Sequence, residues 1–311
     1  MQKLDIYRTY SLLIATLLIT IVLSISIGSV IIYPKDIFFS LLTLIPFFDY
    51  QADISESLTV IINQLRLPRI LLAGIVGFSI ALSGATFQAI FKNPLADPYL
   101  IGAASGSALG ATIVLMLIGP IILMQISILP LASFLGGVIA VGITVMISFS
   151  SRSMSSNTLI LSGIAVGALA NAITSLIIIS SDPDVRPLLS WLLGSFNTAN
   201  WDEVLITIPY VLISTILLFR YRRIMNIIQS SDSEAQLVGV EVNKTKYILI
   251  LISTLLTAIA VSVSGIIGFI GLVAPHAVRL IWGYDYKYLI PFSACLLYTS
   301  DAADEGLGVD L

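Results

Sequence analysis

Long uninterrupted runs of apolar residues, separated by short polar segments, dominate this sequence. An apolar helix of about 20 residues crosses the ~30 Å hydrocarbon core of a bilayer, and several runs are of this length. The pattern predicts spanning helices at about residues 11–32, 61–90, 99–118, 129–150, 158–180, 203–219 and 246–263. The chain is therefore expected to be an all-α polytopic membrane protein.

A glycine-rich stretch, Ser264–Gly271, follows the last of these helices. Gly265, Gly268 and Gly271 recur every three residues, and a glycine inside a helix costs about 1 kcal/mol. We expect a broken or re-entrant segment here, followed by a short half-helix, 275–282. Such a backbone persists at membrane depth only where protein buries it or where it lines a cavity.

The composition agrees with a membrane domain and excludes a soluble one. The 311 residues are 57% hydrophobic and 11% charged, whereas globular chains carry about 25% charged residues. The apolar runs are continuous rather than alternating, which excludes a transmembrane β-barrel. The single cysteine, Cys295, permits no internal disulfide, and the lone histidine, His276, cannot form a metal site by itself.

Basic residues predict the orientation, because they are enriched in cytoplasmic loops. With a cytoplasmic N-terminus, eleven of the fifteen basic residues fall on the inner side and four on the outer side. The run 11–32 is too long for the apolar region of a signal peptide, so we expect a retained first helix. Arg66 and Arg69 then lie on the outer face, against the bias.

One long polar segment, 220–246, interrupts the apolar pattern in the interior of the sequence. Within it, Glu234–Gly239 is typical of a short helix that ends at a glycine. A polar segment of this kind is usually a solvated loop. Apolar residues that have no membrane to face favour a protein contact instead.

Several motifs together resemble the FecCD-type permeases, the membrane subunits of ABC importers for ferric siderophores, haem and cobalamin. They are Leu65-Arg-Leu-Pro-Arg69, Ser83-Gly-Ala85 with Gln88, Asn93-Pro-Leu-Ala-Asp-Pro98, Leu161-Ser-Gly-Ile164, Trp191-Leu-Leu-Gly194, Glu234-Ala-Gln-Leu-Val-Gly-Val240 and Gly268-Phe-Ile-Gly-Leu-Val-Ala-Pro-His276. The resemblance runs from about residue 10 to Ala294.

The resemblance implies a ten-helix permease in a prokaryotic cell membrane that works as a homodimer or close heterodimer. It implies an external substrate-binding protein, two cytoplasmic ATPase subunits and a substrate path along the dimer axis. The permease itself is expected to hold no cofactor, no metal and no nucleic acid. Consistent with this, the sequence lacks a phosphate-binding loop of the G-x-x-x-x-G-K-[ST] kind.

The resemblance also implies roles for individual residues. Arg66 and Arg69 would dock the binding protein, since an arginine pairs with carboxylates through two parallel hydrogen bonds; snorkelling anchors are the alternative. The segment 221–244 would couple the permease to the ATPase. Its candidate coupling residues are Arg222, Glu234, Ala235, Leu237, Gly239 and Val240.

Four residues are candidates for the translocation pathway. Gln88 and Asn171 are polar side chains inside apolar helices, where such groups face protein or water rather than lipid. They either line the pathway or join helices by hydrogen bonds. Gly84 and Gly106 are the other two candidates, and for Gly106 close helix packing is the alternative that we favour.

The last residues, 295–311, differ from the rest of the chain, with four acidic residues and no basic one. Residues 295–305 correspond to one reading frame of a transposase-type sequencing adapter. We therefore expect a non-native tail after a permease domain at 1–294, with the ninth helix incomplete and the tenth missing. Without this tail, the acidic balance of the chain disappears and gives no information about partners.

Two other functions belong to different classes. A secondary transporter would need an intramembrane acid or base for ion coupling, and the helices predicted between residues 61 and 263 show none. A non-transporting membrane scaffold is the second alternative, and co-purification with an ATPase subunit would distinguish it from a transporter.

Overall fold

The computed structural model describes residues 3–28, 30–42, 55–119, 122–123, 126–149, 155–181 and 184–293. Its α-helices are α1 (Lys3–Ser26), α2 (Pro34–Leu42), α3 (Glu56–Val60), α4 (Leu67–Phe91), α5 (Ala103–Thr112), α6 (Ile128–Phe149), α7 (Ser156–Ser180), α8 (Arg186–Leu193), α9 (Trp201–Ser230), α10 (Asp232–Leu237), α11 (Val242–Ser264) and α12 (Ile270–Trp282). Residues 286–293 are also helical, and the predicted tail lies outside the described residues.

Shorter elements complete the chain. They are the π-helical turns η1 (Ile61–Arg66) and η3 (Ile113–Ile118), the 3-10 turn η2 (Pro98–Ile101), and the strands β1 (Ile122–Leu123) and β2 (Ile126–Ser127). The two strands form a two-residue antiparallel pair, the only sheet in the part of the chain that the structure describes. The predicted all-α fold is confirmed.

Five helices of the described ranges are long and apolar enough to cross a membrane: the continuous helix Glu56–Phe91, α6, α7, α9 and α11. Shorter apolar helices cover Tyr10–Ser26, Ala103–Ile118 and α12. Each predicted span therefore falls on an apolar helix. The first prediction is shifted, since α1 ends at Ser26 rather than near residue 32.

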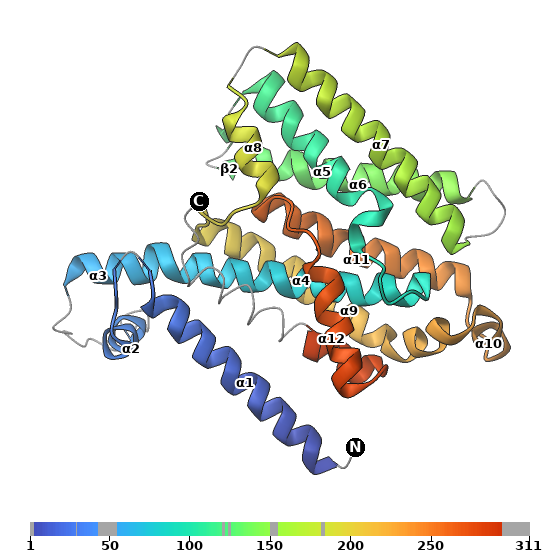
Figure 1. Cartoon of the computed structure of the whole chain (residues 1–311), viewed down its shortest axis with the longest axis horizontal. Coiled ribbons are helices and arrows are strands. Elements are labelled where there is room, and N and C mark those ends of the chain that lie inside the picture. The colour runs from blue at the N-terminus through green and yellow to red at the C-terminus, as the bar shows by residue number, and fades with distance from the viewer. Residues whose placement is uncertain are drawn as a thin grey trace.

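The helix α4 forms the centre of the molecule, and it packs against α9, α11 and α12 (Figure 1). In its most apolar window 83% of residues are buried, against 28% in α7 and in α9. Small residues such as Gly74, Gly77 and Ala81 lie among the buried positions, and such residues let neighbouring helices approach closely. The outer faces of α7 and α9 remain exposed and apolar.

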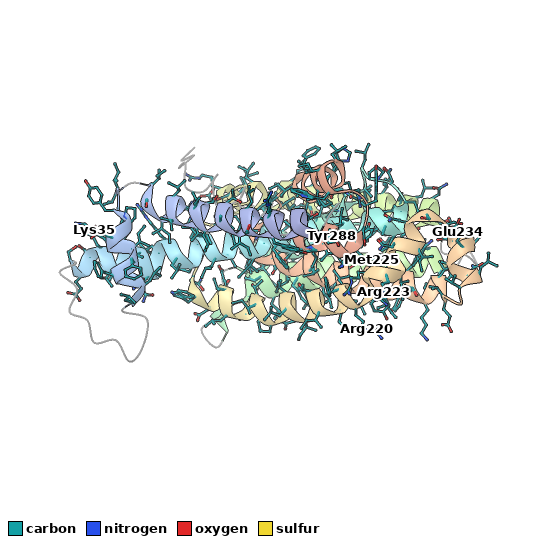
Figure 2. The ribbon with its side chains drawn as sticks, turned by 90° about the horizontal axis from the view of Figure 1, so that it is seen from below. Lys35, Arg220, Arg223, Met225, Glu234 and Tyr288 are labelled. Carbon is teal, nitrogen blue, oxygen red and sulfur yellow. The ribbon has the colours of Figure 1, made fainter. Side chains whose placement is uncertain are left out.

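The two ends of α4 define two ends of the molecule. Lys92, directly after α4, forms an ion pair with Asp232 of α10, so we call this side the α10 end. Arg66 and α3 lie at the opposite side, the α3 end, about 39 Å away along the helix axis. Lys35 and Glu234 lie toward these opposite ends of the long axis (Figure 2).

The polar segment 220–246 is mostly helical, which corrects the predicted end of the helix 203–219. The helix α9 continues to Ser230, eleven residues beyond the predicted end at residue 219. Apolar contacts explain the extension, because Ile228 packs with Ala235 and Val242 in one cluster. The predicted short helix is confirmed as α10, which is followed by Gly239 at φ +82°.

The predicted break after α11 is confirmed at residues 265–269, although the next helix begins at Ile270 rather than at Pro275. Protein contacts hold the start of this break: Ser195 N–H donates to the carbonyl of Ser264 (2.9 Å), and the Tyr99 hydroxyl donates to that of Ile267 (2.9 Å). Gly268 and Phe269, at its end, are exposed. Pro275 removes the donor that would bond the Gly271 carbonyl inside the helix. That carbonyl lies directly against Gly84 of α4.

Candidate functional site

The helix α10 forms a corner between α9 and α11, and two apolar side chains, at its last residue and directly after it, are exposed. The Ser231 hydroxyl accepts hydrogen bonds from the Ser233 and Glu234 N–H groups and caps the helix. Leu237 is 87% exposed and Val238 is 64% exposed. Contiguous exposed apolar side chains mark contacts with a protein or with a membrane.

The predicted coupling residues do not all lie on this surface. Glu234 and Leu237 are exposed, whereas Ala235 is fully buried, and its carbonyl accepts the N–H of Val240 (2.9 Å). Ala235 and Val240 therefore stabilise the corner from its inner side. Arg222 lies separately on α9, with its guanidinium 4.0 Å from the centroid of the Phe219 ring.

An ion cluster fastens α10 to the rest of the protein. Asp232 accepts from the Lys246 ammonium at 2.7 Å and pairs with Lys92 at 3.0 Å. Burial would raise the pKa of the Asp232 carboxyl, but hydrogen bonds from Lys246 and Lys92 outweigh burial and hold that pKa below its usual range. The cluster joins α10 to the end of α4 and to α11.

Asp232→Asn is expected to loosen α10. It leaves the Lys246 ammonium, whose side chain is 3% exposed, without a carboxylate. The cost should be about 1–2 kcal/mol, less than for a fully buried pair because Asp232 is 39% exposed. Hydrogen exchange of amides 233–240 should become roughly 5- to 30-fold faster at neutral pH.

The control for Asp232→Asn is Glu241→Gln, which breaks only the exposed pair between Lys244 and Glu241. Equal exchange rates in the two variants would show that the cluster does not hold α10.

The stabilisation by the cluster should also depend on pH. Because the folded pKa of Asp232 is lowered, the cluster stabilises the fold above the ordinary carboxyl pKa, and that stabilisation is lost as the pH falls through the folded pKa.

Arg66 and Arg69 lie on neighbouring turns at the α3 end, opposite α10. The Arg66 guanidinium donates to the carbonyl of Ile25, in the last turn of α1, and to that of Val30 at 2.6 Å. It therefore satisfies a carbonyl that the end of α1 leaves without a helical partner. A substitution of Arg66 would act on this link as well as on docking, which stays a prediction.

Gln88 belongs to a buried polar network that sequence analysis missed. The Arg279 guanidinium of α12 donates to the side-chain oxygen of Gln88 and to the Tyr286 hydroxyl (3.1 Å). Tyr286 donates in turn to the carbonyl of Ala85 (2.8 Å). Arg279 is 6% exposed, and within the described residues no acidic side chain forms an ion pair with it. The position of Arg279, the one charge within the apolar run 270–282, was the available signal.

Gly84 and Gly106 are packing positions inside the chain. A Cβ atom at Gly84 would overlap the backbone oxygen of Gly271, and one at Gly106 would overlap Ala140 and the backbone of Gly136. Gly84 thus permits the contact of α4 with α12, and Gly106 that of α5 with α6. Their pathway role stays a prediction.

Asn171 lies apart from the other pathway candidates. It is exposed on α7 beside Leu169, which is 62% exposed, and Ile173. Gly84 and Gln88 both face α12, one turn apart on α4, whereas Gly106 faces α6. The structure of this chain therefore brings together two of the four candidates.

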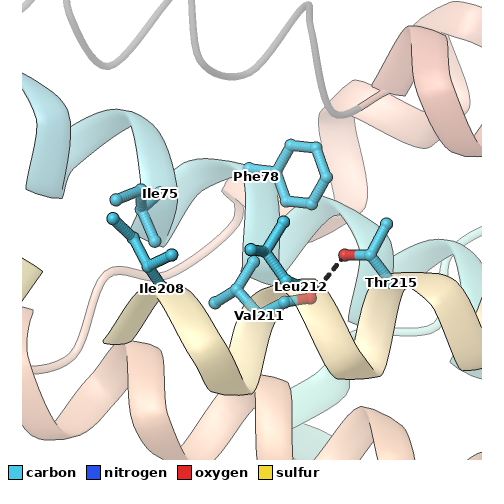
Figure 3. Close-up of a pocket in the computed structure, with 6 residues that line it drawn as sticks. All are labelled: Ile75, Phe78, Ile208, Val211, Leu212 and Thr215. Carbon is cyan, nitrogen blue, oxygen red and sulfur yellow. Dashed lines mark hydrogen bonds between the residues drawn. The ribbon is translucent and has the colours of Figure 1, made fainter. Parts of the chain in front are cut away.

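An apolar groove of about 200 Å³ lies between α4 and α9. Its lining residues are Ile75, Phe78, Ile208, Val211, Leu212 and Thr215 (Figure 3). The Thr215 hydroxyl donates to the carbonyl of Val211 (2.6 Å), so its bond is made within α9. This lining offers apolar contact and no charged group for a polar substrate.

Comparison with known proteins identifies relatives. Residues 16–300 match a model described as the FecCD transport family. The cobalamin import system permease protein BtuC of Halobacterium salinarum is 39% identical over 244 residues, 78% of this chain and 65% of that protein. The hemin transport system permease protein HmuU of Yersinia pestis is 39% identical over 250 residues, 76% of this chain and 73% of that protein.

A solved structure is similar over most of its length. It is described as a metal-chelate type ABC transporter in an inward-facing conformation, and its TM-score with this chain is 0.79 at 30% sequence identity. The match covers 95% of this chain and 88% of that one. This chain spans 65% of the length of the Halobacterium salinarum permease.

Proposed function

Because this chain belongs to the FecCD transport family, we propose that it is the membrane permease subunit of an ATP-driven ABC importer. Its substrate is a metal chelate of the iron-siderophore, haem or cobalamin type, delivered by an external binding protein. The exposed apolar pair of Leu237 and Val238 on α10 carries this proposal. It gives an ATPase subunit a surface on a membrane protein that itself has no phosphate-binding loop.

In this proposal, force from the ATPase enters at α10 and reaches the centre of the bundle. The Lys92–Asp232 ion pair links α10 to the end of α4. One turn from that end, Gln88 of α4 is hydrogen-bonded to Arg279 of α12. A displacement of α10 would therefore move α4 and α12 together, and such rigid-body shifts of packed helices can open one side of a pathway.

The two ends of the molecule take different partners in this proposal. The α10 end faces the cytoplasm, together with the N-terminus, and the α3 end faces the binding protein. Arg66 and Arg69 contribute the docking charges there, and acidic residues on the binding protein pair with them. The lengthwise separation of Arg66 from α10 supports this assignment, since docking and coupling need opposite sides of the membrane.

A second permease subunit covers the exposed face of α7. Asn171 lies on that face, and an amide that faced lipid there would lack hydrogen-bond partners. A second subunit can supply those partners and enclose a pathway between the two copies. With this contact in place, Asn171 would face the pathway, whereas Gly106 packs against α6 inside the chain.

Leu237→Asp is the test of the proposed coupling. The new charge should weaken binding of a co-expressed ATPase subunit roughly 30-fold, as expected for a central apolar contact worth about 2 kcal/mol. The measurement is co-purification of the two subunits from membranes. Because Leu237 is 87% exposed, the substitution should leave the fold unchanged.

Arg186→Gln is the matched control, since it changes charge at an exposed site outside the segment 221–244 and breaks only an exposed ion pair of 3.0 Å. It should retain the ATPase. If Leu237→Asp retained the ATPase equally well, α10 would not be the coupling surface. A scaffold would then be the better description of the chain.

A secondary transporter gains no support from the buried charge of Arg279. The guanidinium is held by the neutral side chains of Gln88 and Tyr286, and no acidic side chain among the described residues pairs with it.

A further inference from the structure

The exposed face of α9 changes from apolar to basic at one point along the helix. Ile206, Ile213 and Ile216 are 40%, 60% and 69% exposed. Arg220 and Arg223 continue the same face, because positions three, four and seven residues apart lie above one another on a helix. Both arginines are exposed, and Figure 2 shows them along α9 at the lower edge of the molecule.

The length of α9 places this change at the surface of the membrane. Trp201 begins the helix, and tryptophan is enriched at membrane interfaces. Arg220 lies about 28 Å further along the axis, which matches the ~30 Å thickness of the hydrocarbon core. The Arg220 and Arg223 side chains therefore reach the depth of lipid headgroups while Ile213 and Ile216 face acyl chains.

The two charges have no acidic partner among the described residues. Two other exposed cations do have one: Arg186 pairs with Asp184 at 3.0 Å, and Lys244 pairs with Glu241 at 3.4 Å. An unpaired arginine keeps its planar set of donors available for an external anion. Phosphate is well matched to it, because it accepts two parallel hydrogen bonds.

We propose that Arg220 and Arg223 bind the phosphate of an anionic phospholipid headgroup, with the acyl chains of that lipid along Ile213 and Ile216. Side chains three residues apart on a helix are neighbours, so one phosphate can contact both guanidinium groups. The apolar stripe directly below them favours a lipid over a soluble anion or an acidic protein. This inference needs only that α9 spans the membrane. It assigns Arg223, near the start of the segment 221–244, to lipid rather than to the ATPase.

The test uses the full chain in phosphatidylcholine nanodiscs in which about one lipid in five is the anionic phosphatidylglycerol. Native mass spectrometry counts the lipids of each class that stay bound. The wild-type chain should retain phosphatidylglycerol preferentially. Arg220→Gln with Arg223→Gln should lower that preference roughly 30-fold, since each basic residue near the surface contributes about five-fold.

The matched control is Arg186→Gln with Lys244→Gln, which removes the same number of charges from cations that already have carboxylate partners. It should keep the preference. Arg220→Lys with Arg223→Lys retains charge but loses the planar fork, and it should give an intermediate preference even if the glutamine variant folds poorly. An unchanged preference in the glutamine variant, or an equal loss in the control, would overturn the proposal.

Discussion

Gly84→Ala is expected to destabilise the protein by about 3 kcal/mol or more, the upper range for overpacking a core. The added Cβ would overlap the backbone oxygen of Gly271 and lie 2.8 Å from its carbonyl carbon. Backbone cannot rotate away as a flexible side chain can, so α4 and α12 would have to separate. The measurement is the free energy of unfolding of the purified chain in detergent.

Separation of these helices would also stretch the contact between Gln88 and Arg279, one turn further along α4. Uptake should therefore fall together with stability. The matched control is Gly142→Ala in α6, where an added Cβ meets nothing within 4 Å. That variant should be as stable as the wild type, or more stable by up to about 1 kcal/mol because alanine is the better helix former.

A Gly84→Ala chain with the stability of the Gly142→Ala control would contradict the close contact of α4 with α12. It would mean that the two helices can move apart without loss.

Gln88→Leu is expected to have the second large effect, because it removes an acceptor from a buried cation. The Arg279 guanidinium would keep its hydrogen bond to Tyr286 but lose the one to the amide oxygen. Loss of a hydrogen bond to a buried charged group costs about 3 kcal/mol. Unfolding free energies, measured in the same detergent, should show this loss.

The double variant Gln88→Leu with Arg279→Met separates the cost of an unpaired charge from the cost of lost packing. With the charge gone, the leucine leaves no buried cation short of a partner. The double variant should therefore recover most of the stability, with a coupling free energy of about 2 kcal/mol. Strictly additive effects would show that Gln88 and Arg279 do not contact each other in the folded protein.

Transport should not recover in the double variant, if the network moves α4 and α12 together as proposed. Stability and uptake would then respond differently to the same pair of substitutions. Recovered uptake would assign the network to folding alone.

Local features of the sequence predicted the elements that local energetics control. Apolar runs of spanning length gave the long helices, because their burial in lipid depends only on their own composition. The glycine that predicted the end of the short helix, Gly239, has φ +82° and lies just after α10. The break after Ser264 followed from closely spaced glycines in the same way.

Contacts between distant residues were beyond such patterns. The helix α9 extends eleven residues beyond its predicted end because Ile228 packs in one cluster with Val242. Sequence polarity alone had ended the helix at residue 219. Arg222 was grouped with α10 by its position in the chain, yet it packs on Phe219 in α9. Ala235 and Val240 were predicted to contact the ATPase, and in the structure Ala235 is buried and Val240 packs against the same cluster.

The sequence by itself determined that this protein is a helical membrane protein of one family, with spans, breaks and a short helix outside the membrane. The spans, breaks and short helix follow from the hydrophobic effect and the backbone preferences of short stretches, whereas the family follows from the resemblance of its motifs. Only the tertiary structure decided that Arg279 meets Gln88 across 191 positions of the chain, and that Arg66 holds the end of α1. Such pairings depend on how whole helices pack, and helix packing depends on the shapes of many side chains at once.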